Sequence, residues 1–116
     1  MITVTAEGKY ALVAEGHAGQ AQKGQDIVCS AMSMLMGSLA EFVLHNRERC
    51  IDAEVVLTSG YAKVRAYPQK EFEKECAGAF CMASLGIELL KSKHPEYVTE
   101  KTQPTGLPLN ALIMIY

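Results

Sequence analysis

The sequence of 116 residues is long enough for one domain with a single core, and its 49% hydrophobic content leaves apolar surface for an interface. The formal net charge is −2 and charges of both signs are interspersed, so there is no basic stripe of the kind that binds nucleic acid. These properties argue against a multidomain protein and against direct binding of nucleic acid.

No targeting segment is recognisable. Met1–Thr5 is strand-like, without the basic start and long apolar stretch of a signal peptide, and no run reaches the ~18 apolar residues of a membrane helix. We therefore expect a cytoplasmic protein without membrane attachment, whose cysteines are reduced. The cysteines at 29, 50, 76 and 81 form no C-x-x-C pair and no histidine completes a zinc site, so neither a metal nor another cofactor is expected.

Two strands are predicted at the start of the chain. Residues 1–7 alternate between apolar and polar side chains, which indicates a strand, and a second strand is predicted over residues 10–15. Gly16 ends that strand, because its backbone freedom suits an abrupt exit. His17 is thus held by a strand on one side and followed by the small and polar loop 18–25 on the other.

A long helix is predicted from about residue 27 to residue 47. Asp26 is a good helix cap, and Cys29 falls three residues later, in the predicted first turn. Unpaired backbone N–H groups and the positive end of the helix dipole favour the thiolate form of a cysteine there. Gly37 lies inside the helix, where glycine costs about 1 kcal/mol relative to alanine, so we expect a close packing contact at this position. The predicted core-facing stripe is Val28, Met32, Leu35, Leu39 and Phe42.

Cys29 and His17 together supply a thiol and a general base. A nearby imidazole favours the thiolate and can later protonate a leaving amine. Asp26 either caps the helix or orients His17, and the sequence does not choose between these roles. Ser33 lies four residues after Cys29, on the same helical face. It either donates a hydrogen bond near the sulfur or the substrate, or is a small residue that permits close packing.

The rest of the chain predicts two strands and a second long helix. Strands are expected over residues 52–58 and 61–67, joined by a tight turn at Ser59-Gly60, and a helix over about residues 70–93. Residues 97–99 are a candidate fifth strand. The order β-β-α-β-β-α indicates an α+β fold, with a mainly antiparallel sheet of four to five strands packed with two long helices.

Alternating aromatic and basic residues lie along one face of the strand 61–67. The four side chains are Tyr61, Lys63, Arg65 and Tyr67. Such a pattern occurs in platforms that bind nucleic acid. With only two cations in a negatively charged chain, a solvent face or the wall of a peptide groove is the better interpretation.

The second helix has a wider apolar surface than one contact with a sheet needs. Its predicted core stripe is Phe72, Cys76, Ala79 or Phe80, Ala83, Ile87 and Leu90. Met82, Leu85 and Leu89 form another stripe beside it, which predicts a homodimer. The strongly apolar end of the chain, within residues 101–116, must also dock. It either covers the same domain, crosses to the partner subunit at the dimer interface or lies in the peptide groove.

The spacing of these residues resembles the ribosomal-processing cysteine protease family (Prp, or YsxB-like), over about residues 1–100. The resemblance is carried by Gly16-His17-Ala18, Gly24, Asp26-Ile27-Val28-Cys29 and Ser33. It implies that Cys29 is the nucleophile and His17 the base, with Gly16, Asp26 and Ser33 as supporting positions. It also implies a small dimeric bacterial enzyme that binds a protein substrate.

In that family the implied reaction is removal of an N-terminal extension from a ribosomal protein of the large subunit. Related proteins in phages are thought to trim phage proteins instead. This sequence departs from the family pattern in the stretch 105–116 and in the loop 19–23, which leaves the substrate open.

Two other functions are compatible with the residues alone. One is a non-catalytic binding module for ribosome assembly, in which Cys29 is a buried residue at a helix start. The other is a thiol redox sensor, although the other cysteines are badly placed to resolve an oxidised Cys29. A selectively reactive thiol distinguishes the protease from the binding module.

Overall fold

The computed structural model describes residues 1–16 and 23–101, with the backbone alone for residues 23–26. Within these residues the elements are β1 (Ile2–Gly8), β2 (Ala11–Glu15), α1 (Lys23–His45), β3 (Cys50–Thr58), β4 (Tyr61–Pro68), α2 (Glu73–Lys93) and β5 (Val98–Lys101). Short 3-10 turns precede β3 at Arg47–Arg49 and α2 at Lys70–Phe72. The apolar tail, predicted to dock, lies outside the described residues.

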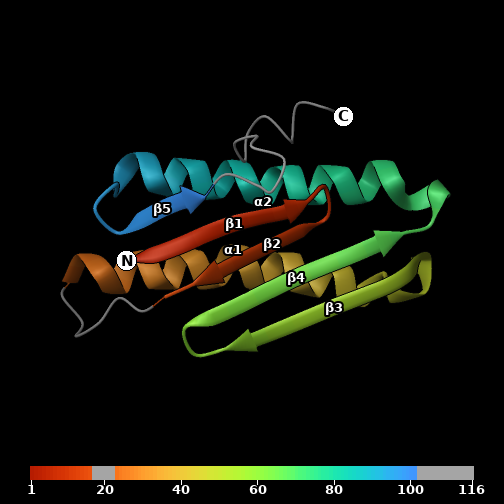
Figure 1. Cartoon of the computed structure of the whole chain (residues 1–116), viewed down its shortest axis with the longest axis horizontal. Coiled ribbons are helices and arrows are strands. Elements are labelled where there is room, and N and C mark those ends of the chain that lie inside the picture. Colours follow the sequence, from red (N-terminus) through yellow and green to blue (C-terminus); the bar gives the residue numbers. More distant parts are fainter. Residues whose placement is uncertain (17–22, 102–116) are drawn as a thin grey trace.

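The strands form one mixed sheet in the order β3-β4-β2-β1-β5. All neighbouring pairs are antiparallel except β1 and β5, which are parallel. Both helices lie on the same face of this sheet and leave the other face open (Figure 1). The predicted α+β fold with a mainly antiparallel sheet and two long helices is therefore confirmed.

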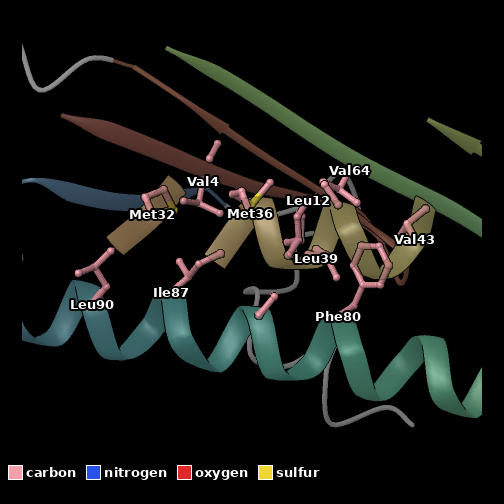
Figure 2. Packing of buried hydrophobic residues seen from close by; sticks show 14 of the residues in the cluster. Val4, Leu12, Met32, Met36, Leu39, Val43, Val64, Phe80, Ile87 and Leu90 are labelled. Carbon is pink, nitrogen blue, oxygen red and sulfur yellow. The ribbon is translucent and has the colours of Figure 1, made fainter. Parts of the chain in front are cut away.

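Alternation along the strands places apolar side chains between the sheet and the helices. Val4 and Val64 are fully buried, and Leu12, which is paired with Val64, is nearly so (Figure 2). The buried residues of α1 are Val28, Met32, Met36, Leu39, Ala40 and Val43. The predicted stripe contained Leu35 and Phe42 in place of Met36, Ala40 and Val43. The difference arises because α1 faces both the sheet and α2. Leu35 is therefore only half-buried, at the point where it lies against Gly86 of α2.

The core stripe predicted for the second helix is confirmed. Cys76, Phe80 and Ile87 are among its buried residues. At the start of α2, Phe72 stacks on Phe42 of α1 with ring centroids 5.6 Å apart, and the Arg49 guanidinium lies 4.3 Å from the centre of the Phe72 ring. These contacts tie the end of α1 to the beginning of α2.

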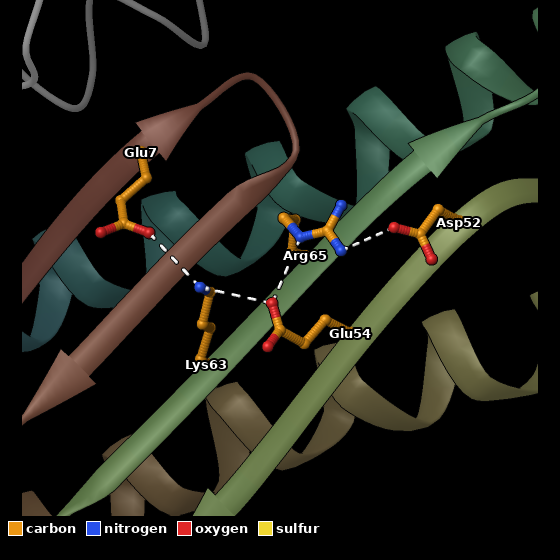
Figure 3. A network of polar contacts seen from close by, with 5 residues as sticks. All are labelled: Glu7, Asp52, Glu54, Lys63 and Arg65. Atoms are coloured by element: carbon orange, nitrogen blue, oxygen red, sulfur yellow. Dashed lines mark hydrogen bonds and ion pairs between the residues drawn. The ribbon is translucent and has the colours of Figure 1, made fainter.

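The open face of the sheet carries a network of paired charges (Figure 3). Lys63 lies 3.3 Å from Glu54 and 3.9 Å from Glu7, while Arg65 donates to Asp52 at 2.8 Å and to Glu54 at 3.3 Å. Hydrogen bonds from Arg65 lower the pKa of Asp52, and those from Lys63 and then Arg65 lower the pKa of Glu54. Both cations of β4 are thus paired with carboxylates of this face, as expected of a solvent face.

Helix α1 is unusually apolar. Its segment Ile27–His45 has a mean hydropathy of 1.8, and by length and composition alone it would suffice to cross a membrane. The core helix of a soluble domain meets the same criterion, and α1 packs against both β4 and α2. The expectation of no membrane attachment stays a prediction, which the composition of this helix does not by itself support.

Candidate active site

A pocket of about 360 Å³ lies between α1 and the turn that joins β3 to β4. Helix α1 contributes Cys29, Ser33 and Gly37, together with two buried methionines, while residues 57–62 form the opposite wall. Ile2 and the strand end up to Gly16 also line it. The pocket thus brings together residues from four separate parts of the sequence.

Gly16 holds the end of β2 against two neighbouring segments. Its φ of +125° lies in a region that favours glycine, and a Cβ at this position would overlap the backbone oxygen of Met1. Its N–H also donates to the backbone oxygen of Gly60, at 2.9 Å, in the turn between β3 and β4. The residue that precedes His17 is therefore fixed at the edge of the pocket.

Cys29 lies half-buried in this pocket, but not in the first helical turn. Helix α1 begins at Lys23, so Asp26 is its fourth residue and Cys29 its seventh. The prediction that Cys29 lies in the first turn is wrong, because residues 23–25 continue the helix toward the N-terminus. Of the two roles left open for Asp26, capping the helix is excluded for the same reason, and orienting His17 stays a prediction. The influence of a helix dipole is largely confined to the first turn, so activation of this thiol must depend more on a general base.

Ser33 lies one turn beyond Cys29, with an exposed side chain that lines the same pocket. The predicted proximity of these two residues on one helical face is confirmed. Gly37 follows one turn later. The close packing contact expected there is not found among the described residues, because a Cβ built at Gly37 would meet none of their atoms within 4 Å. The missing side chain leaves open space beside the pocket instead.

Two of the predicted site residues are not placed by these observations. His17 lies outside the described residues, and so does the side chain of Asp26. The assignment of His17 as the base therefore stays a prediction. What is established is that the residue before His17 and the thiol of Cys29 line one pocket.

Residues 57–60 of the pocket wall opposite α1 were missed from the sequence, which indicated only a strand end and a tight turn there. Tyr61 belongs to the face for which the wall of a peptide groove was one of two interpretations. Leu57 is 51% exposed although it lies on the helix-facing side of β3, where it is paired with Ala62. An apolar residue next to a Ser-Gly turn was the available signal. It could not be connected to Cys29, because only the sheet order brings this turn beside Gly16.

The other thiols differ from Cys29 in their surroundings. Burial raises the pKa of Cys76 to about 12, with a smaller contribution from nearby Cys50, and burial also raises the pKa of Cys50. Neither residue lines the pocket, nor does Cys81. Among the side chains of residues 1–16 and 27–101, no group of three or more His, Cys, Asp or Glu could hold a metal ion.

Known proteins resemble this chain over most of its length. SMU.848 from Streptococcus mutans is 29% identical, with a TM-score of 0.69 over 87% of this chain and 92% of that one. Two structures of the S. aureus ribosomal processing protease Prp, one with a covalently linked product peptide and one with a substrate peptide, are 16% and 12% identical. Their TM-scores are 0.65 and 0.66, over 87% and 86% of this chain and 98% and 95% of theirs, so they support the fold.

No curated protein sequence matches the chain. A sequence model described as "Cysteine protease Prp", however, matches residues 1–99. That match includes every described strand and helix that lines the pocket around Cys29. The chain therefore belongs to the cysteine protease Prp family.

Proposed function

We propose that this protease removes an N-terminal extension from a ribosomal protein of the large subunit, with Cys29 as nucleophile and His17 as general base. The observation that carries the proposal is the position of Cys29 in a pocket that is also lined by Gly16, the residue directly before His17. The similarity in fold to S. aureus Prp, a ribosomal processing protease, supports the choice of substrate.

The chemistry assigns one role to each side chain. His17 takes the thiol proton as the sulfur of Cys29 attacks the carbonyl carbon of the scissile bond. The imidazolium then protonates the leaving amine, and the acyl group remains on the sulfur as a thioester. Water, deprotonated by His17, hydrolyses the thioester and regenerates the thiol. Ser33, one turn from Cys29 on the pocket wall, is positioned to hydrogen bond to the bound peptide.

The test is cleavage of purified large-subunit ribosomal proteins that carry N-terminal extensions. We expect the wild-type chain to shorten one of them at a single bond, detected by intact mass and N-terminal sequencing. Cys29→Ala and His17→Ala should each lower the rate at least about a thousandfold, because both take part directly in the reaction. Cys81→Ala is the matched control, since Cys81 is a half-buried cysteine that does not line the pocket.

Two outcomes would contradict the proposal. Cleavage that persists in Cys29→Ala would remove the nucleophile assignment. A chain that spares every ribosomal protein but cuts a phage structural protein would replace the ribosomal role by the phage-related one.

We further propose a homodimer formed through α2. Met82, Leu85 and Leu89 recur at helical spacing on the side away from the core and are 73%, 51% and 58% exposed. Sedimentation should give twice the 12.6 kDa chain mass, and a Leu85→Glu, Leu89→Glu variant should sediment as a monomer. A monomeric wild-type chain would contradict the dimer.

We also propose that the enzyme acts in the cytoplasm, without direct contact to nucleic acid. All four cysteines are free thiols, as is usual in reducing compartments. The pairing of Lys63 and Arg65 with carboxylates supports the absence of a basic surface on the open face of the sheet.

A further inference from the structure

Gly37 is a glycine in the middle of α1 that packing does not explain. Glycine is less favourable than alanine inside a helix, because its backbone loses more conformational freedom on folding. At Gly86 of α2 the reason is visible, because a Cβ there would collide with the side chain of Leu35. A Cβ at Gly37 would meet no atom of the described residues within 4 Å, although Gly37 lines the pocket. The absent side chain therefore leaves volume in the pocket rather than making room for a neighbouring element.

The surroundings of Gly37 determine what kind of group fits that volume. Met32 and Met36 are buried on the helix side, and Leu57 belongs to the opposite wall. Among the described residues that line the pocket, none carries a charge. An apolar side chain would bury its surface here without separating any charge from water, whereas a charged side chain would lose hydration without an opposite charge among the described lining residues.

The position of Gly37 relative to the nucleophile gives the register of that side chain. Gly37 is the eighth residue after Cys29, and a rise of 1.5 Å per residue places the two roughly 12 Å apart along α1. An extended peptide advances roughly 3.3 Å per residue. A peptide that lies along the pocket with its scissile bond at Cys29 thus brings a residue three or four positions away to Gly37.

We propose that Gly37 is a specificity-determining residue, which leaves room for an apolar side chain of the substrate three or four residues from the bond that is cut. This inference rests on the proposed peptidase function of the same pocket. It adds a second recognition point, separate from the reacting groups. Two or three substrate residues lie between this point and the scissile bond.

The test uses a synthetic library of extended peptides built around the sequence that wild-type enzyme cuts, varied one position at a time. We expect the wild type to prefer Leu, Ile or Phe over Gly at one position three or four residues from the bond. Gly37→Phe should lower kcat/KM for the preferred peptide roughly tenfold or more, and should reduce the preference over the Gly-containing peptide, because the volume is now occupied. Gly37→Ala should do so more weakly and favour smaller apolar residues.

Ser38→Phe is the matched control. It introduces the same ring one residue further along α1, at an exposed position that does not line the pocket, and should leave the cleavage profile unchanged. Alkylation of Cys29 and the unfolding midpoint verify that each variant is folded with an accessible thiol. If Gly37→Phe is too unstable to assay, the change in the cleavage profile of Gly37→Ala decides whether the inference holds.

A folded Gly37→Phe or Gly37→Ala enzyme with the wild-type profile would overturn the inference, and so would a wild type indifferent to every residue three or four positions from the bond. Both results leave the peptidase function intact. Cleavage that is independent of Cys29 would instead contradict the proposed function itself.

Discussion

The two ends of α1 are built in opposite ways. Near its C-terminus, Phe42 stacks on Phe72 and the guanidinium of Arg49 covers that ring, so the space between the helices is filled. Toward its N-terminus and as far as its middle, Cys29 and Gly37 line a pocket of about 360 Å³. One helix therefore combines a closed end that stabilises the fold with an open end that admits a ligand. Substitutions at the closed end should change stability, and those at the open end should change activity.

Alkylation of the cysteines should give the largest contrast between these ends. Cys76, at the closed end, is fully buried and has a pKa raised to about 12, so at pH 8 only about one molecule in ten thousand carries its thiolate. Cys29 lines the open pocket. With iodoacetamide at pH 8, mass spectrometry should find Cys29 modified and Cys76 unmodified in the folded chain, and both modified in urea. Equal rates of alkylation of Cys29 and Cys76 in the folded chain would contradict the predicted difference between the two ends.

Phe72→Ala should produce the largest loss of stability. Its ring is 1% exposed and contacts both Phe42 and Arg49, so its removal should lower the free energy of unfolding by about 3–5 kcal/mol. Chemical denaturation measures this loss, and the kcat of the remaining folded enzyme should be nearly unchanged. Tyr67→Ala is the control, because Tyr67 is 59% exposed and its loss should cost less than about 0.5 kcal/mol. A strong fall in kcat would show that the two ends are coupled.

Gly16→Ala should lower stability less than Phe72→Ala does, but it should have a clear effect on activity. The positive φ and the overlap with Met1 should cost about 1–3 kcal/mol. Because the strand end before His17 must move, kcat/KM should fall further than the folded fraction does. Gly78→Ala, at an exposed helical position with no close neighbour, should instead be neutral or slightly stabilising. Full activity in folded Gly16→Ala enzyme would separate this glycine from catalysis.

Local patterns predicted most of the fold because they report on burial directly. The alternation of Ile2, Val4 and Ala6 and the stripe around Phe80 on α2 are both buried as expected. The order of the strands was not predicted. The parallel pairing of β5 with β1 depends on a crossover through α2, and no residue within β5 encodes it.

The class of enzyme was predicted from the sequence, but the shape of the pocket was not, and the roles of Cys29 and His17 stay predictions. Helical spacing grouped Cys29 with Ser33, and the family resemblance added Gly16; all three line the pocket. The helix start was misplaced because aspartate is equally acceptable at two positions. It can cap a helix, or it can lie in the first turn, where its negative charge is stabilised by the helix dipole. Gly37 was misread because an absent side chain has the same sequence signature whether a neighbour or a cavity occupies its place.

The wall opposite Cys29 belongs to the end of a hairpin whose outer strand, β3, lies at the edge of the sheet. Replacing the tip of such a hairpin disturbs few core contacts, since Thr58 and Ser59 are exposed. This short segment can therefore be replaced, in evolution or by design, with little effect on the rest of the fold. The nucleophile-bearing helix would stay as it is while the enzyme acquires a different preferred sequence.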